Sequence, residues 1–333
     1  MAYDANIMAS AQRAFQEERD RREMNFARRA QEIYSRVPRV EEIDRELRHT
    51  VGRLMIAAFE QEMDPEIALR GLREKNLALQ RERAELLVGA GYAYDVLDER
   101  VNCNNCGDSG YLSDGSPCRC LMAYYTREQN KRLSKLLDLG NQSFDTFSLD
   151  WYDSETRGEY GVSPLKNMEI VLEICSNYAH TFGPRSGNLL FTGAPGLGKT
   201  FLSACIAREV SENGFSVVYD TAAHIFQQFE SGKFGRENPY EEDPDREINR
   251  YLNCDLLIMD DLGTEMTTSF VQSAFYRIIN DRLINRRKTI LSTNLKPQEL
   301  SARYGAAVGS RIEGEYQIMR FFGKDIRLQK RNR

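Results

Sequence analysis

The sequence lacks an apolar run long enough to cross a membrane, and its first residues lack the apolar core of a signal peptide. It also lacks a large excess of charge of one sign. The formal net charge of −5 argues against a protein that coats nucleic acid, although a local basic groove stays open. These absences exclude a membrane-spanning protein and predict no membrane partner.

Cysteine is infrequent, and four of the seven cysteines fall in one short stretch. The other three, Cys175, Cys205 and Cys254, lie in apolar segments. In a chain without a secretion signal, this distribution indicates one metal site plus buried thiols, and therefore a reducing, cytoplasmic compartment. The 333 residues are 41% hydrophobic and 29% charged, which is typical of a soluble globular protein of about two or three domains.

The N-terminal third is rich in Arg and Glu and has long runs without Pro or Gly. Three helices are expected: one over residues 11–36, one beginning near Glu41, and one beginning at Pro65 and ending at Gly89 or Gly91. They predict a helical hairpin or small bundle preceded by a charged arm. The region has no catalytic constellation, so it is either a structural helical domain or a docking module for a protein partner.

The clustered cysteines, Cys103, Cys106, Cys118 and Cys120, form a C-x2-C knuckle followed by a C-x-C pair. Four thiolates can surround Zn²⁺ tetrahedrally, and with no histidine near and no open coordination position a structural zinc is favoured. A redox or disulfide pair and an iron–sulfur cluster are the alternatives. A helix is expected to follow over residues 121–139.

Residues 193–200 read Gly-Ala-Pro-Gly-Leu-Gly-Lys-Thr and fit the P-loop pattern. Residues 188–192 form an apolar run of strand length, and residues 201–210 have helical spacing. This context separates a phosphate-binding loop from a glycine-rich turn that binds nothing. Lys199 would reach the β- and γ-phosphates of ATP, and the Thr200 hydroxyl would ligate Mg²⁺.

A second apolar run, residues 256–261, ends in two carboxylates. Asp260 fits a Mg²⁺ ligand, and Asp261 fits the group that orients and activates the attacking water. Glu265 either assists or lies on the surface. Asn294, at the tip of an expected strand over residues 289–294, would bond the γ-phosphate or the water, and a turn role explains it nearly as well. The nucleotide-binding set is Gly193, Pro195, Gly196, Gly198, Lys199, Thr200 and Asp260.

Strands are also expected over residues 215–219 and 318–326, and helices over residues 164–182, 269–287 and from Ser310. Residues 144–152 are aromatic-rich and are expected to link the cysteine module to the next domain, and residues 327–333 form a basic tail. The alternation predicts an α/β P-loop domain with a parallel sheet, preceded by an all-α N-terminal region and a small zinc-binding module. The ligand site is expected at the carboxyl ends of the strands. The expected domains are residues 1–92 (helical, docking), 93–140 (cysteine module and linker helix) and 141–333 (ATPase).

These motifs together resemble the AAA+ ATPases. They are more closely similar to the DnaC- and DnaI-type loaders of the bacterial replicative helicase and their IstB-type transposition relatives. The residues that carry the resemblance are 193–200, 257–263, 292–294 and 309–312. It covers about residues 144–327.

The resemblance implies an ATPase with Asn294 as sensor 1 and Arg311 as an arginine finger that completes the ATP site of a neighbouring subunit, so self-assembly is expected. Asp261 stands where many AAA+ proteins have Glu. The implied activity is slow and stimulated by DNA or assembly, with ATP, Mg²⁺ and Zn²⁺ as cofactors.

The implied function is loading of the replicative DNA helicase onto single-stranded DNA, with the N-terminal region docked on the helicase. Basic candidates for DNA contact are Arg282, Arg286, Arg287 and Lys288, and a solvated helix end explains them equally well. The alternatives are an IstB-type ATPase that regulates transposition, or a nucleotide-switched adaptor without significant turnover.

Overall fold

The computed structural model describes residues 4–59, 65–98, 101–135, 137, 141–155, 161–234 and 244–331. The chain divides into two compact units. One consists of Ala14–Cys118, and the other of Met1–Arg13 together with Arg119–Arg333. No helix in the described ranges is long and apolar enough to cross a membrane.

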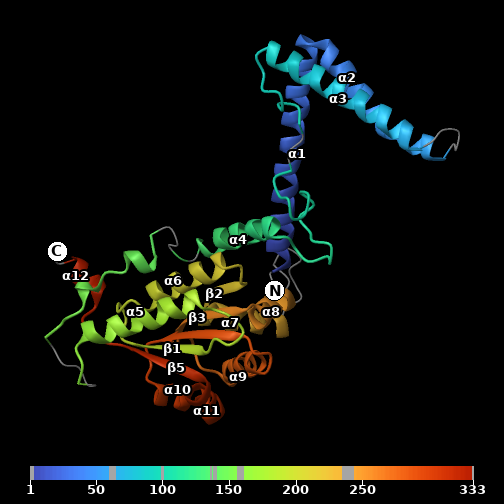
Figure 1. The fold of residues 1–333 in the computed structure, drawn as a ribbon. Helices are drawn as coiled ribbons and strands as arrows, with labels where there is room; N and C mark the ends of the chain where they lie inside the picture. The colour runs from blue at the N-terminus through green and yellow to red at the C-terminus, as the bar shows by residue number, and fades with distance from the viewer. Residues whose placement is uncertain are drawn as a thin grey trace. The chain divides into compact units, whose positions relative to one another are not determined.

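Three helices begin the chain: α1 (Ala5–Arg36), α2 (Pro38–Phe59) and α3 (Pro65–Gly89). The predicted three helices are confirmed, with α2 and α3 packed side by side as a hairpin (Figure 1). Two starts were predicted too late. Asp4 accepts a hydrogen bond from the Asn6 N–H at 2.7 Å, so α1 begins at Ala5. α2 begins at Pro38, because proline suits the first helical turn.

Helix α4 (Arg119–Leu133) follows the cysteine stretch and ends earlier than the predicted residue 139. The Lys135 N–H bonds the Arg132 carbonyl at 3.2 Å, a three-residue step that tightens the chain into a turn after Leu133. Lys131 and Arg132 occupy its last turn, where positive charge is favourable. Residues 136, 138 and 139 of the predicted helix lie outside the described residues.

The larger unit is built on a five-stranded sheet in the order β2-β3-β4-β1-β5, and all its pairings are parallel. This confirms the predicted α/β class. The strands are β1 (Asn188–Gly193), β2 (Val217–Thr221), β3 (Leu256–Leu262), β4 (Lys288–Thr293) and β5 (Tyr316–Phe321). Two strand predictions need correction. β2 begins at Val217 rather than residue 215, and β5 stops at Phe321, so Ile326 begins helix α12 (Ile326–Arg331) instead of ending a strand.

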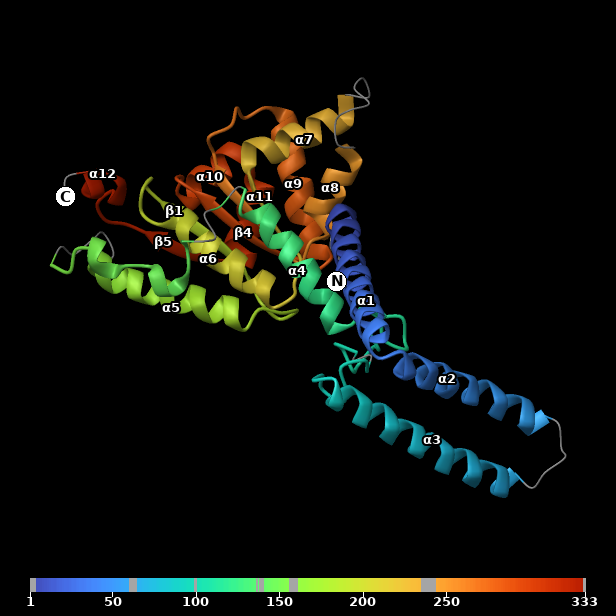
Figure 2. The same ribbon diagram turned by 90° about the horizontal axis from the view of Figure 1, so that it is seen from above.

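Helices cover both faces of the sheet (Figures 1 and 2). Side chains alternate along each strand: Leu189 and Phe191 of β1 enter one hydrophobic cluster, and Leu190 enters the other. The first cluster includes residues of α5 (Pro164–His180) and α6 (Lys199–Glu212). The second cluster includes residues of five other helices: α7 (Ala222–Phe234), α8 (Pro244–Asn253), α9 (Ser269–Ile284), α10 (Pro297–Tyr304) and α11 (Ala306–Glu315).

Two helix boundaries differ from the prediction for identifiable reasons. α9 ends at Ile284 rather than residue 287, because Arg286 takes a left-handed conformation with φ of 53°. The Arg287 N–H then bonds the Arg282 carbonyl at 2.8 Å, which is a Schellman stop without its usual glycine. α11 begins at Ala306, so Ser310 lies inside this helix and does not start it.

Candidate nucleotide-binding site

The P-loop connects β1 to α6 and bends back over the start of that helix. Gly198 has φ of 93°, and a Cβ there would come within 2.8 Å of the Tyr152 hydroxyl. Gly196 has φ of 74°, and its Cβ would meet the Asp325 carboxylate at 2.0 Å. Both positions therefore require glycine. No side chain caps the first N–H groups of α6, which leaves them free to bind an anion.

Lys199 lies buried inside this loop, with 6% of its surface exposed. Its Nζ donates to the carbonyls of Gly193 at 2.5 Å and Ala194 at 2.9 Å, and to the Asn294 amide oxygen at 2.8 Å. All three acceptors are neutral. Burial lowers the pKa of Lys199 to about 8, against the raising effect of Asp260 and Asp261. A phosphate beside Nζ would supply the missing negative charge.

The end of β3 brings its first carboxylate against the P-loop helix. The Thr200 hydroxyl donates to Asp260 Oδ2 at 2.9 Å, so the two predicted Mg²⁺ ligands lie together. The Asp260 side chain is almost completely buried. A hydroxyl and a carboxylate with this placement fit a hard divalent cation, which prefers oxygen ligands.

The Asp261 side chain points in a different direction from the Asp260 side chain, because the pairing of β3 with β4 is interrupted here. The β3–β4 register shifts between Met259 and Leu262, and Asp261 takes a left-handed φ of 53°. Its side chain lines the pocket above the P-loop. Desolvation, with a contribution from Asp260, raises the pKa of Asp261. A carboxylate with a raised pKa that faces the pocket suits the predicted role of orienting and activating water.

The pocket itself has a volume of about 330 Å³. It brings together most of the predicted nucleotide residues and, in addition, side chains that the sequence interpretation assigned to a linker and a tail. Its lining includes Pro195, Gly196, Gly198, Lys199, Thr200, Asp261 and Asn294, together with Phe147, Trp151, Arg327 and Lys330. This volume lies within the range of small-ligand sites.

The aromatic segment before α5 forms one wall of this pocket. It consists of two short 3-10 helices, η1 (Phe144–Thr146) and η2 (Leu149–Trp151). The Phe147 ring contacts Phe201 edge-on at 5.4 Å, and Tyr152 donates to the Leu197 carbonyl of the P-loop at 2.9 Å. These residues were predicted only to link two domains. The high density of aromatic residues directly before the P-loop domain is the sequence feature that could have indicated this pocket wall.

Helix α12 forms another part of the wall. The Ile326 N–H bonds the Gly196 carbonyl at 2.9 Å, and Lys330 Nζ lies 5.6 Å from the Trp151 ring centroid. Arg327 lines the pocket and acts electrostatically on both Lys199 and Asp261. Sequence interpretation treated these residues as a basic tail, because charge alone does not show which way a helix faces.

Arg311 lies away from the residues that line this pocket. It donates to the Tyr276 hydroxyl at 2.9 Å and the Asn280 amide at 3.0 Å, and it stacks over the Tyr276 ring at 4.6 Å. In the described part of the chain no carboxylate pairs with it. This position excludes a contact with its own nucleotide pocket and is compatible with the implied role in a neighbouring subunit.

Two other predicted candidates have structural roles. Arg282 is fully buried and donates to the Tyr251 carbonyl at 2.6 Å and to Thr289 at 2.9 Å. It is therefore removed from the DNA-contact candidates, because none of its surface is accessible. The Glu265 carboxylate accepts from Tyr304 and from the Gly263 N–H, so it anchors the loop after β3.

The four clustered cysteines converge as predicted. The Sγ atoms of Cys103, Cys106, Cys118 and Cys120 all lie within 4.8 Å of one another. Cys103 and Cys118 are 3.6 Å apart at sulfur, too far for a disulfide and close to the roughly 3.8 Å edge of a tetrahedron with 2.3 Å Zn–S bonds. Asp108 accepts the N–H of Cys103 at 2.8 Å. The thiol set therefore fits Zn²⁺.

Zinc is expected at one ion per chain, measured by elemental analysis of the purified protein. Cys103→Ser should lower the zinc content to near zero and increase amide hydrogen exchange across residues 101–118, because bound metal supplies the folding free energy of such loops. Cys205→Ala, which removes a buried thiol outside the cluster, is the control and should keep the full zinc content. A parent protein that is metal-free and equally protected in this loop would contradict the assignment.

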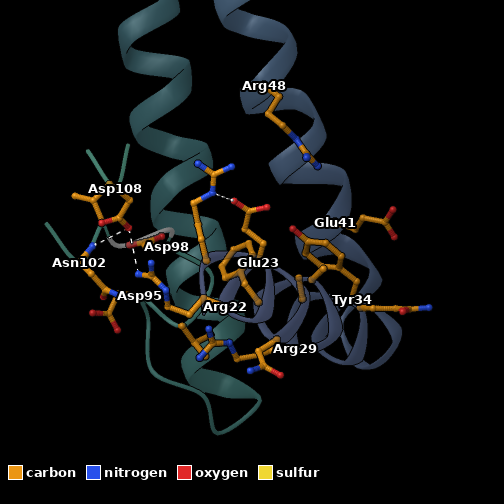
Figure 3. A pocket seen from close by; sticks show the side chains of 18 of the residues that line it. Arg22, Glu23, Arg29, Tyr34, Glu41, Arg48, Asp95, Asp98, Asn102 and Asp108 are labelled. Atoms are coloured by element: carbon orange, nitrogen blue, oxygen red, sulfur yellow. Dashed lines mark hydrogen bonds and ion pairs between the residues drawn. The ribbon is translucent and has the colours of Figure 1, made fainter. Parts of the chain in front are cut away.

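The smaller unit carries a groove of about 1510 Å³ (Figure 3). One wall comes from α1, with Arg22 and Arg29, and the opposite wall includes Asp98, Asn102 and Asp108 from the residues after α3 and the cysteine stretch. Arg22 pairs with Asp108 at 3.2 Å. The cysteine loop is therefore held against α1 by an ion pair at the edge of this groove.

Comparison with known proteins places residues 172–332 in a family described as IstB-like ATP binding protein. The replicative helicase loader DnaC of Buchnera aphidicola subsp. Baizongia pistaciae is 30% identical over 135 residues, which are 40% of this chain and 54% of the relative. DnaC of Escherichia coli K12 is 28% identical over the same shares. The chain thus spans about half the length of these relatives.

A crystal structure of the DnaC helicase loader matches with a TM-score of 0.43 and 22% identity, over 56% of this chain and 99% of that chain. The P-loop, the Thr200–Asp260 pair and the family match all fall in the same part of the sequence. Residues 172–332 of this chain match the model described as IstB-like ATP binding protein, and part of the chain is similar at modest identity to replicative helicase loaders.

Proposed function

We propose that this protein is an ATP-dependent loader of a replicative DNA helicase onto single-stranded DNA. The observation that carries the proposal is the buried Lys199 ammonium, whose hydrogen-bond acceptors are all neutral, at a P-loop whose neighbouring Thr200 and Asp260 oxygens fit Mg²⁺. This site lies in an IstB-like domain similar to helicase loaders. ATP is therefore the proposed ligand, and its hydrolysis is the proposed reaction.

In this mechanism the P-loop N–H groups and Lys199 bind the β- and γ-phosphates. Thr200 and Asp260 would hold Mg²⁺, which would neutralise charge on the phosphates. Asp261 orients the attacking water, and Asn294 reaches the γ-phosphate side of the pocket. Arg311 of a neighbouring subunit stabilises the charge of the transition state.

The Ala14–Cys118 unit is the proposed helicase-docking module. Its support is the exposed groove between α1 and the cysteine stretch, with charged residues of both signs along its walls. Contact with single-stranded DNA is assigned to the ATPase unit, where Arg286, Arg287 and Lys288 remain candidates after Arg282 is removed. Arg287 pairs with Asp255, which makes Arg286 and Lys288 the freer cations of this group.

The test uses the full-length chain as bait in extract of the host, with ATP or ADP present and mass spectrometry of the retained proteins. A replicative helicase that is retained in one nucleotide state and released in the other is the expected result. Lys199→Ala, which should no longer bind nucleotide, is the control and should show no difference between ATP and ADP.

Two other outcomes would overturn the proposal. Recovery of a transposase would support an IstB-type regulator of transposition. A nucleotide-dependent partner without measurable ATP turnover, with or without DNA, would support a nucleotide-switched adaptor.

A further inference from the structure

The Asp260 carboxylate accepts one hydrogen bond from a residue that belongs neither to the P-loop nor to the strand end that contains Asp260 and Asp261. Its Oδ2 accepts from Thr200 at 2.9 Å and from the Tyr219 hydroxyl at 2.6 Å, while Oδ1 accepts the Asp261 N–H at 2.9 Å. The Tyr219 bond is the shortest of the three. A carboxylate that is 2% exposed is thus held by one neighbour from the P-loop helix, one from its own strand and one from β2.

Strand register explains how a residue of β2 reaches this position. Tyr219 pairs with Ile258 of β3, two residues before Asp260, so the three side chains share one face of the sheet. The Tyr219 side chain then extends toward the carboxyl ends of the strands, across the distance from Ile258 to Asp260. The length of the tyrosine side chain brings its terminal hydroxyl to Asp260 from that register.

The surroundings shield this hydrogen bond from water. The Tyr219 ring is 6% exposed and belongs to the hydrophobic cluster under α6. The bond between its hydroxyl and the Asp260 carboxylate therefore lies in the interior, where a hydrogen bond is stronger than in water.

We propose that Tyr219 is a positioning residue for the magnesium-bound nucleotide. Its hydroxyl fixes the orientation of the Asp260 carboxylate beside Thr200. This inference rests on the proposed binding of ATP with Mg²⁺. Neighbours that orient a metal-binding group act on metal affinity by about 10- to 100-fold when removed. Tyr219 would therefore act on the magnesium-dependent part of nucleotide affinity and leave direct phosphate contacts unchanged.

Tyr219→Phe keeps the ring and removes only the hydroxyl. ADP affinity is measured by calorimetry, once with Mg²⁺ and once with EDTA. We expect about tenfold weaker binding with Mg²⁺, and unchanged binding in EDTA. The Mg²⁺ concentration that gives half-maximal ADP binding should rise by the same factor.

Tyr251→Phe is the matched control. Tyr251 is also buried, and its hydroxyl donates to the Asp220 carboxylate at 2.7 Å, in the same unit but outside the nucleotide pocket. It should bind ADP as the parent does in both conditions. If Tyr219→Phe is poorly folded by circular dichroism, Tyr219→Met gives the same comparison with a flexible apolar side chain.

Equal weakening with Mg²⁺ and with EDTA would overturn the proposal, because it would show a general structural role for Tyr219. Unchanged affinity in both conditions would overturn it as well. A parent chain that binds no nucleotide in either condition would remove the proposed function and this inference together, so the two failures are distinguishable.

Discussion

Lys199→Ala should reduce ATP affinity by about a hundredfold or more, which puts binding below detection at ordinary protein concentrations. The ammonium lies against three neutral oxygens. With nucleotide it would form at least two charge-assisted hydrogen bonds to phosphate, each worth about 1.5 kcal/mol or more. Their loss totals about 3 kcal/mol, which is about two orders of magnitude in affinity.

Fluorescent ATP titration measures this directly, and circular dichroism shows whether the variant is folded. Lys166→Ala is the control: this lysine is exposed on α5 and pairs with Glu169 at 2.9 Å, so its removal should leave affinity within twofold. An affinity of Lys199→Ala equal to that of the parent would exclude the P-loop assignment, whatever the turnover of the protein.

Arg311→Ala should leave ATP binding unchanged and lower the hydrolysis rate of the assembled protein by about a thousandfold. Arginine fingers contribute about 10³- to 10⁵-fold to turnover. Arg311 meets the physical requirement for such a role, since its described acceptors are a phenol, an amide and a carbonyl rather than a carboxylate. Its positive charge remains available for a phosphate on another subunit.

Mixing two inactive variants makes this test specific. Arg311→Ala subunits have an intact P-loop, and Lys199→Ala subunits have an intact Arg311, so the mixture should regain activity that neither variant has alone. Arg277→Ala, an exposed arginine of α9 paired with Asp281, is the control and should hydrolyse ATP at the parent rate. Full activity of Arg311→Ala at high protein concentration would show that the residue is no finger.

The features predicted correctly from the sequence are local ones. The P-loop and the Asp260–Asp261 strand end are contiguous patterns, and alternation of strands and helices was sufficient for the parallel sheet. The four cysteines were recognisable from spacing alone, and their sulfur atoms do converge. In each case the pattern can be recognised within the sequence segment itself.

Features that depend on direction or register were missed. Tyr219 looks like an ordinary strand residue until the β2–β3 register places its hydroxyl at Asp260. Arg282 is charged, and the sequence therefore suggests that it lies on the surface. It is buried instead, because the carbonyl groups of Tyr251 and Cys254, at and just after the end of α8, accept hydrogen bonds from its guanidinium. Arg327 reaches the pocket only because α12 folds back over Gly196. Neither the charge of a residue nor the hydrophobic periodicity of its segment shows which residues of other segments it contacts.

The position of β1 in the sheet has a consequence for the synthesis of the protein. Its two partners, β4 and β5, are the last strands of the chain, and β5 pairs with β1 as far as Gly193 at the mouth of the P-loop. A ribosome therefore completes the P-loop long before the strands that flank it exist. Pairing of such distant segments forms late, since loop closure must precede it. The nascent chain therefore cannot assemble the proposed nucleotide site until β5 has emerged.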